Sequence, residues 1–439
     1  MVHSSASVRV LLLSDCFPPD PVVGSLRTAK IAGALAEAGH QVQVVTSRLP
    51  GEVKGTRIAG RGITIHTVRA IPHPRMAYLL AKRWLGRTDA SSGSPPPELF
   101  ATAIPRWKRY LVSLFLLPDD RQGFIPPAVL ACLQIHRRCS GVDLVYTTAP
   151  PFSVHVAGLV FKWLTGVKWA AEFRDPWTDN PAKSVRVRTG LSDAIERHLE
   201  RWCLKTADRV VSATDAIHEL LVCKEAPRPG QRFVVARNGI DRLAPRSRSA
   251  PIAEPFRIVH TGSLYHGRDP RPFLRALASL RERGRLADRE VQVEFVGEGR
   301  WFHNVSVEQL VQDLGLSATV HFLDWVPHRV CLEIIEHAHL LLLLAQDQPA
   351  QVPNKLFEYL GARKPILAFA DAHGEVARML RRVGNHYLVA QDDPALAETV
   401  LDRALRDLRA AGGMHTEEDV LREWTTQHQM EQLLLALSG

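Results

Sequence analysis

The apolar positions of this chain fall into short runs, separated by longer stretches in which apolar and polar residues follow helical spacing. Each run is bounded by polar residues or glycine, a pattern typical of strands buried in a parallel sheet. The runs lie at residues 8–13, 41–46, 63–69, 143–148, 167–173, 209–212 and 233–236, and then at 256–260, 291–296, 319–322, 339–344 and 366–369. Helices are expected between them, for example at residues 25–38 and 270–283. This alternation predicts an α/β protein with two successive doubly wound, Rossmann-like sheets.

A segment of linker composition separates the two series. Residues 242–255, RLAPRSRSAPIAEP, contain proline, serine and arginine and little that would be buried. We therefore predict a first domain at residues 1–241, the linker at 242–255 and a second domain at 256–415. Residues 416–439 are expected to end the chain as a helix.

Composition adds limits but no function. A hydrophobic fraction of 46% and a charged fraction of 23% are ordinary for a globular protein of 439 residues. The net charge of +9 suits a binder of phosphate, anionic lipid or nucleic acid, without choosing among them. The six cysteines form no C-x-x-C pair, so a disulfide framework and a cysteine metal site are disfavoured. No signal peptide and no apolar run of roughly 18 residues is present, so we expect a cytoplasmic location.

The stretch at residues 353–368, PNKLFEYLGARKPILA, carries the most chemistry. Pro353 suits the first turn of a helix, Asn354 could cap that turn, and Lys355 and Glu358 share one face because they are three residues apart. Free backbone N–H groups and Lys355 would attract a phosphate, and Glu358 could accept hydrogen bonds from sugar hydroxyls. The alternative is an amphipathic helix with a surface Lys–Glu pair.

Polar residues also follow strands of the first domain. Gly24 and Ser25 stand at a helix entry, where backbone N–H groups could face a phosphate, although the alternative is a simple turn. The loop is not G-x-G-x-x-G, which disfavours a nicotinamide or flavin cofactor. Arg174 and Asp175 follow the strand at 167–173, and His155 lies on the helix after the strand at 143–148. These three residues could take part in acceptor chemistry, or they could have only structural roles, as a loop ion pair and a histidine on a helix face.

Two segments, residues 75–87 and 106–117, combine basic and aromatic residues beside apolar runs. Such segments suit peripheral contact with a membrane or a lipid-linked acceptor. The alternative is ordinary packing helices with solvated arginine rims. No nucleic-acid motif is present, so we expect no nucleic-acid partner.

Taken in order, several motifs make the chain resemble the GT-B glycosyltransferases, specifically the large retaining family 4. These motifs are FPPDPVVGSLR, TTAPPFSVH, EFRDPW, NGID, HTGSLYHGRDP, FVGEG and PNKLFEYLGARKPI. The resemblance implies two Rossmann-like domains facing a central cleft, with a C-terminal helix at residues 416–439 that crosses back to the first domain. It also implies a nucleotide-sugar donor, most often linked to UDP, bound mainly by the second domain.

The resemblance assigns roles to individual residues. It implies that Gly262 and Ser263 approach the donor, that Arg268 and Lys355 neutralise the diphosphate, and that Glu358 holds the ribose. The full set expected at the donor is Gly24, Ser25, Gly262, Ser263, Arg268, Gly297, Asn354, Lys355 and Glu358. The set expected at the acceptor is Asp175, Arg174 and His155.

One position departs from the family pattern. The first glutamate of the family's E-x7-E motif would fall at Ala350, which has no carboxylate. No D-x-D motif occurs, so we predict no catalytic metal and no cofactor apart from the nucleotide-sugar. The favoured function is a hexosyl- or N-acetylhexosaminyltransferase of polysaccharide or glycolipid biosynthesis, working in the cytoplasm or at the inner face of the membrane. The alternatives are an inactive transferase-like binding partner and a nucleotide-sugar epimerase of the same fold.

Overall fold

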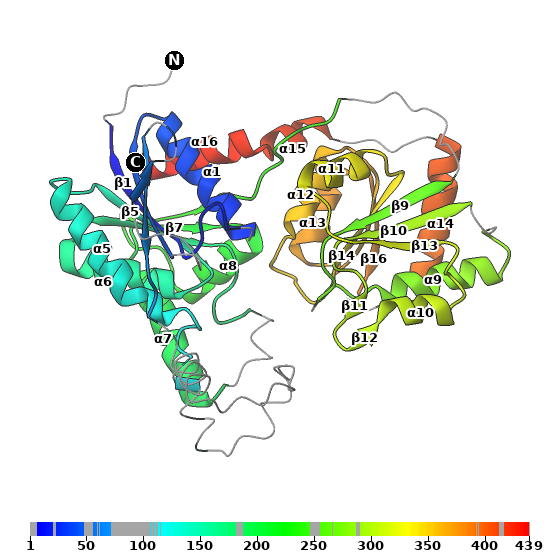
Figure 1. Ribbon diagram of the computed structural model, residues 1–439, viewed down its shortest axis with the longest axis horizontal. Coiled ribbons are helices and arrows are strands. Elements are labelled where there is room, and N and C mark those ends of the chain that lie inside the picture. The colour runs from blue at the N-terminus through cyan, green and yellow to red at the C-terminus, as the bar shows by residue number, and fades with distance from the viewer. Residues whose placement is uncertain are drawn as a thin grey trace, which may run out of the picture. The chain divides into compact units, whose positions relative to one another are not determined.

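The computed structural model describes residues 7–20, 23–47, 56–58, 60, 62–71, 107, 110, 113–114, 116–180, 188–245, 255–265, 267–286, 290–391, 393, 395–411 and 417–438. The chain forms two compact units (Figure 1). Unit 1 comprises Met1–Ala236 and Met430–Gly439, and unit 2 comprises Arg237–Gln429. The predicted segment at 75–87 and half of that at 106–117 lie outside the described residues.

Unit 1 is built on an eight-stranded sheet with the order β3-β4-β2-β1-β5-β6-β7-β8. All neighbouring strands are parallel except β3 and β4, which pair antiparallel. The strands are β1 (Arg9–Leu13), β2 (Gln41–Ser47), β3 (Thr56–Ile58), β4 (Ile63–Val68), β5 (Leu144–Ala149), β6 (Lys168–Phe173), β7 (Arg209–Ser212) and β8 (Arg232–Val235). The doubly wound prediction is therefore confirmed. Strand β3 was not predicted, because its three residues, Thr56–Ile58, contain no apolar run.

Helices lie on both sides of this sheet (Figure 1). They are α1 (Val23–Glu37), the 3-10 turn η1 (Gln122–Phe124), α5 (Ile125–Arg138), α6 (Ser153–Thr165), α7 (Gly190–Thr206) and α8 (Asp215–Lys224). The last helix of the chain, α16 (Thr426–Ser438), adds Met430 and Leu433 to the core formed by Val10, Leu12 and Val44. These apolar contacts explain why the end of the chain belongs to unit 1.

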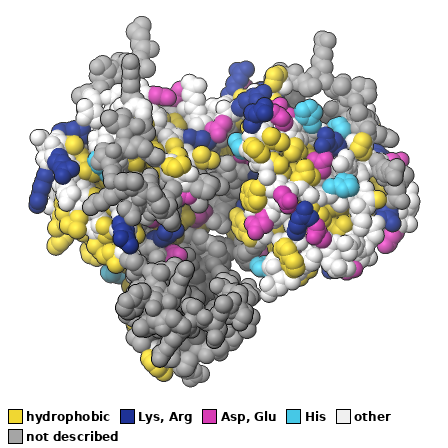
Figure 2. Space-filling model, in the orientation of Figure 1, with side chains coloured by type: hydrophobic (Ala, Val, Ile, Leu, Met, Phe, Trp, Pro, Cys, Tyr) yellow, Lys and Arg dark blue, Asp and Glu magenta, His cyan; other side chains and the backbone are white. Residues whose placement is uncertain are grey.

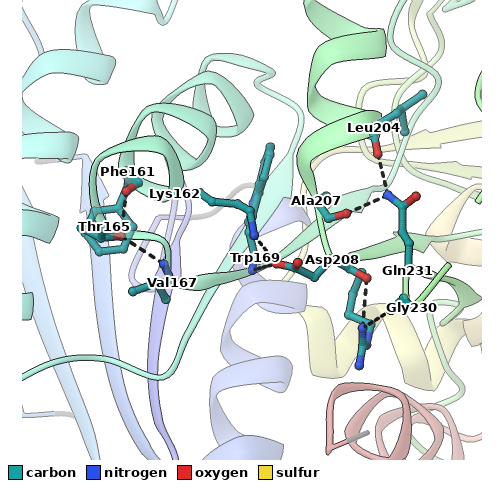
Figure 3. Close-up of polar contacts among 11 residues, drawn as sticks. Phe161, Lys162, Thr165, Val167, Trp169, Leu204, Ala207, Asp208, Gly230 and Gln231 are labelled. Atoms are coloured by element: carbon teal, nitrogen blue, oxygen red, sulfur yellow. Dashed lines mark hydrogen bonds and ion pairs between the residues drawn. The ribbon is translucent and has the colours of Figure 1, made fainter. Parts of the chain in front are cut away.

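A polar network fastens the amino ends of three neighbouring strands (Figure 3). The Asp208 carboxylate accepts hydrogen bonds from the Trp169 backbone N–H at 2.7 Å and from Lys162 at 2.5 Å (Figure 3). The Gln231 amide donates to the carbonyls of Leu204 and Ala207. The opposite edge of the sheet, where the strands have their carboxyl ends, carries the candidate site residues of this unit.

Unit 2 contains a six-stranded, entirely parallel sheet with the order β13-β10-β9-β14-β15-β16 and a separate small hairpin. The strands are β9 (Phe256–Thr261), β10 (Val291–Val296), β13 (Val320–Leu323), β14 (Leu340–Ala345), β15 (Ile366–Ala370) and β16 (His386–Ala390), with β11 (Trp301–Phe302) and β12 (Val305–Ser306) in the hairpin. Along β14, Leu340, Leu342 and Leu344 enter one core, whereas Leu341 and Leu343 enter the other. A strand buried on both faces needs this continuous apolar run.

The helices of unit 2 cover both faces of its sheet (Figure 1). They are α9 (Arg271–Glu282), α10 (Val307–Asp313), α11 (His328–Glu336), α12 (Asn354–Gly361), α13 (Glu375–Val383), α14 (Leu396–Ala411) and α15 (Glu418–Glu423). The expectation of one continuous terminal helix is wrong, because α15 and α16 are separated at Trp424 and Thr425. Ile240 donates to the Trp424 carbonyl at 2.8 Å and accepts from the Thr426 N–H at 2.9 Å, and this pairing interrupts the helix.

The described surface offers no element suited to crossing a bilayer. None of the helices in the described ranges is long and apolar enough for a transmembrane span.

Hydrophobic and charged side chains are interspersed on the face drawn in Figure 2. All six cysteines are free.

Candidate functional site

Two glycine turns meet at the carboxyl ends of β9 and β10. Gly262 has a φ of +97° and Gly297 a φ of +108°, both in the region that favours glycine. The Gly262 N–H donates to the Val296 carbonyl at 2.7 Å, and a Cβ added to Gly297 would lie 3.4 Å from the Gly262 backbone. The structure therefore brings these two predicted residues together, with backbone against backbone and a positive φ at both positions.

Lys355 extends from the first turn of α12 to this glycine pair. Its side chain is buried, and a Cβ added to Gly262 would lie 3.3 Å from its Nζ. The Nζ atom is 3.2 Å from Nε2 of the buried His260. Burial, together with the nearby Arg268 charge, holds the pKa of Lys355 well below its usual range. The alternative of a surface Lys–Glu pair is thus excluded for Lys355.

Arg268 brings a second cation to the same place. Its guanidinium donates to the Ser263 carbonyl at 3.3 Å and lies 4.0 Å above the Tyr265 ring. Its Nε is buried and has no hydrogen-bond partner among the described residues. Burial lowers the pKa of Arg268. A buried lysine beside a half-buried arginine whose Nε has no partner among the described residues favours an anionic ligand.

Glu358 lies one helical turn after Lys355 and is partly exposed. Its Oε1 is 3.0 Å from Nε2 of His328. A shallow groove passes these two residues; its lining residues are Gly239, Asp241, Arg242, His328, Leu332, Ile335, Glu336, Asn354, Phe357, Glu358, Gly361 and Ala362. Asn354 is the first residue of α12 rather than its cap, because Pro353 occupies the N-cap position without a side-chain hydrogen bond. The expected capping role of Asn354 is therefore wrong.

The buried edge of the site contains residues to which the sequence interpretation gave no role. His260 and Thr261 end β9, and the Tyr359 hydroxyl accepts from the Thr261 N–H at 3.0 Å. His260 stands directly before the T-G-S turn, so its place in the motif was the only available signal. Ala350, at the position of the missing motif carboxylate, is buried.

In unit 1, Arg174 covers the start of α1. Its Nε donates to the Ala149 carbonyl at 3.2 Å, and its guanidinium also contacts the Pro150 carbonyl. A Cβ added to Gly24 would collide with this guanidinium. The structure thus brings Gly24 and Arg174 together. The Ser25 hydroxyl donates to the Asp20 carbonyl at 2.5 Å, so it is already engaged within its own loop.

His155 is enclosed beneath the Arg174 loop. Its imidazole is fully buried, and Nδ1 lies 2.8 Å from Oγ1 of Thr147. Aromatic rings surround it; they belong to Phe152, Trp169, Phe173 and Trp177. Burial, with the Arg174 charge, lowers its pKa to about 3. The imidazole therefore stays neutral near pH 7, and its burial keeps it from contacting an acceptor in this conformation. Asp175, in the adjacent loop, is only partly buried.

A further carboxylate lies at the carboxyl end of β1. Asp15 is almost completely buried, and its Oδ2 is 3.4 Å from Nε of Arg121. Burial is the main reason that its pKa rises to about 6. Among the described residues, no group of three or more His, Cys, Asp or Glu side chains is arranged to hold a metal ion.

Comparison with known proteins covers both units. Residues 24–239 match the glycosyl transferase 4-like domain, and residues 268–435 match the glycosyl transferase-like family. None of the curated proteins matches the sequence.

Among solved structures, the chain is similar to sucrose-phosphate synthase from Thermosynechococcus elongatus, with 16% identity, a TM-score of 0.59 and coverage of 98% of this chain and 94% of that one. It is also similar to HepE from Anabaena in complex with UDP, with 14% identity, a TM-score of 0.60 and coverage of 99% and 100%. A glycosyltransferase from Rickettsia africae gives 12% identity, a TM-score of 0.57 and 98% coverage of both chains. With a parallel sheet in each unit and both family matches in chain order, the protein belongs to the glycosyltransferases of the GT-B fold.

Proposed function

We propose that this protein is a retaining glycosyltransferase that transfers a sugar from a UDP-sugar to an acceptor hydroxyl. The observation that carries the proposal is the pair of basic residues, buried Lys355 and half-buried Arg268, beside the Gly262 turn of unit 2. Further support comes from HepE, which has the same fold and whose structures contain UDP and UDP-glucose.

The chemistry follows from the charge that develops on the leaving group. When the bond to the sugar breaks, negative charge accumulates on the β-phosphate oxygens, and preorganised cations stabilise that charge. Lys355 and Arg268 supply two positive charges without a metal ion, so we propose a metal-independent reaction. Glu358 is proposed to accept hydrogen bonds from the ribose hydroxyls, as its partial exposure on the groove allows. Gly297 and Asn354 are proposed to border the nucleotide.

On the acceptor side, we assign the main roles to Arg174 and Asp175. Arg174 is held by backbone carbonyls at the carboxyl end of β5, which suits it to anchor an acceptor. Asp175, in the same loop, is proposed to orient or deprotonate the acceptor hydroxyl. His155 is proposed to support this loop by packing, because its imidazole is buried and neutral.

The biological setting is also a proposal. We propose a glycan or lipid-linked acceptor, a hexosyl or N-acetylhexosaminyl donor, and a role in polysaccharide or glycolipid biosynthesis. The basic and aromatic composition of residues 75–87 and 106–117 supports work in the cytoplasm close to the membrane surface.

The first test is a binding screen against UDP, GDP, ADP, dTDP and CMP without added metal. Binding is measured by thermal shift and by calorimetry. Stabilisation by UDP alone is expected, because a ligand that binds only the native state raises its stability. Lys355→Met should reduce the shift, whereas Arg403→Met, a change at a largely exposed residue of α14, should preserve it. If no nucleotide stabilises the protein, the proposed donor site is wrong.

One observation favours a second candidate, a transferase-like binding partner without activity. Ala350 replaces the carboxylate that the family places near the sugar ring. The two candidates differ in turnover: the enzyme hydrolyses or transfers from UDP-sugar at a measurable rate, whereas an inactive partner binds UDP and releases no product.

A further inference from the structure

The ammonium group of Lys355 is supported by a buried histidine. His260 is fully buried in β9, and its Nδ1 lies 2.9 Å from the Leu342 carbonyl oxygen. A carbonyl oxygen can only accept, so Nδ1 carries the hydrogen and donates it. The other ring nitrogen, Nε2, then presents its lone pair to Nζ of Lys355 at 3.2 Å. The Leu342 carbonyl thus fixes the tautomer that can accept from Lys355.

We propose that His260 is a positioning residue for the donor diphosphate: its Nε2 accepts from Lys355 and holds the ammonium against the Gly262 turn. This inference rests on the proposed function, because it assumes that the diphosphate binds beside Lys355. It concerns how the cation is held, which the family resemblance did not address.

A neutral acceptor suits this position better than a carboxylate. A carboxylate in place of His260 would orient Lys355 equally well, but it would cancel the charge that the phosphate needs. The imidazole remains uncharged because burial and the charges of Lys355 and Arg268 hold its pKa well below the usual range. One of the three donors of Lys355 is therefore fixed in direction by a neutral group, with no neutralising negative charge on that side.

Among the described residues, no anionic side chain is in direct contact with the pair. The titratable groups that influence Lys355 are Arg268, Glu358 and the thiol of Cys331 in α11. The hydrogen-bonding contact found for Glu358 Oε1 is with His328, and burial raises the pKa of Cys331 to about 11, so this thiol is neutral. On the strand side, the Phe295 ring centroid lies 5.5 Å from that of His260 and closes the pocket around the imidazole.

Two polar substitutions separate the two hydrogen bonds of His260. In His260→Asn, the shorter side chain can still donate to the Leu342 carbonyl but has no atom at the position of Nε2. In His260→Gln, the amide reaches that position and can accept from Lys355. We expect His260→Asn to weaken UDP binding roughly tenfold, as for loss of one hydrogen bond to a charged group, and His260→Gln to restore most of it.

The deciding experiment measures UDP and uridine binding by calorimetry in the full-length protein, with each His260 change made alone and together with Lys355→Met. We expect His260→Asn to leave uridine affinity unchanged, because uridine lacks the diphosphate. We also expect it to have no effect on UDP once Lys355 has become Met, because interacting residues are not additive.

The outcomes distinguish the two proposals. If the unmodified protein does not bind UDP, the proposed donor site fails before any variant is considered. If it binds UDP but His260→Asn weakens uridine as much as UDP, or weakens UDP equally in the Lys355→Met background, His260 is merely structural and the inference is overturned. Unchanged UDP binding in a normally folded His260→Asn protein would overturn it as well.

Discussion

Lys355 and Arg268 illustrate how much a side chain's surroundings decide its chemistry. In the sequence, Lys355 three residues before Glu358 fits both a phosphate site and a surface ion pair. In the structure, Lys355 is buried against His260 and shares its pocket with Arg268. Such an arrangement is costly unless an anion arrives, which is why it indicates a ligand site rather than a stabilising feature.

Replacing Lys355 tests this at the level of turnover. Lys355→Met should lower turnover of a UDP-sugar by roughly a hundredfold or more, because it removes charge stabilisation of the leaving diphosphate. Initial rates would be measured for this variant and for Arg403→Met as a control. A rate close to that of the unmodified protein would remove Lys355 from the site.

A side chain at position 24 should displace Arg174. A Cβ added to Gly24 would collide with the Arg174 guanidinium, so the methyl group of Gly24→Ala would displace Arg174 from the Ala149 carbonyl. If Arg174 anchors the acceptor, we expect the KM for the acceptor to rise while UDP affinity changes little. Calorimetry with UDP and steady-state kinetics with the acceptor would separate the two effects; equal loss in both would contradict the assignment.

Asp15 should make stability depend on pH. Its pKa rises from 3.8 to about 6 on folding, so the folded state binds the proton more tightly than the unfolded state. The resulting stabilisation is present below about pH 4 and is lost as the pH rises to 6, a difference of order 1–3 kcal/mol. Asp15→Asn should abolish this fall and be more stable than the unmodified protein at pH 8. Urea unfolding across this range would measure it, and identical pH profiles would show that Asp15 does not titrate in this way.

At the scale of elements, a glycine allows helix α6 to pack closely against the sheet. A Cβ added to Gly158 would lie 2.5 Å from Cγ2 of Thr147 and 3.0 Å from the indole nitrogen of Trp169. Both neighbours belong to adjacent strands, β5 and β6. The small residue therefore sets how closely the helix approaches the sheet beneath His155.

A pair of glycine substitutions tests this packing. Gly158→Ala should destabilise the protein by about 1–3 kcal/mol through overpacking. Gly33 is also helical, in α1, but a Cβ there would meet nothing within 4 Å. Gly33→Ala should therefore stabilise the protein by roughly 0.5–1 kcal/mol, the helix-propensity gain. Equilibrium unfolding of both variants decides the matter, since equal effects would mean that packing around Gly158 is not limiting.

At the scale of the whole molecule, the chain starts and finishes in unit 1. The break between α15 and α16 depends on the pairing of Ile240 with residues 424–426. Gly239 permits this pairing, because a Cβ there would overlap the backbone of Thr426. The last helix then buries Met430 and Leu433 in the core of unit 1.

Truncating this helix's apolar face should destabilise unit 1. Leu433→Ala should cost about 2–5 kcal/mol, the usual range for a buried leucine. Hydrogen exchange should show faster exchange in strands β1 and β2 and little change in β9 and β14. Leu435→Ala, at a residue that is 66% exposed, serves as the control. Equal exchange in the two variants would contradict the role given to Leu433.

The sequence by itself determined the two sheets, because apolar runs between glycine and polar boundaries have few other stable arrangements. It also marked Lys355 and Glu358 as candidate site residues, since their segment combines a strand end with a helix start, whereas Gly262 became a candidate through the family resemblance. The tertiary structure decided which polar residues are buried and what they contact. Local pattern alone could not place His260 beneath Lys355, 95 residues away in the chain, or enclose His155 among aromatic rings. Nor could it predict the interruption of the last helix at Trp424. Each of these outcomes depends on contacts between distant segments of the chain.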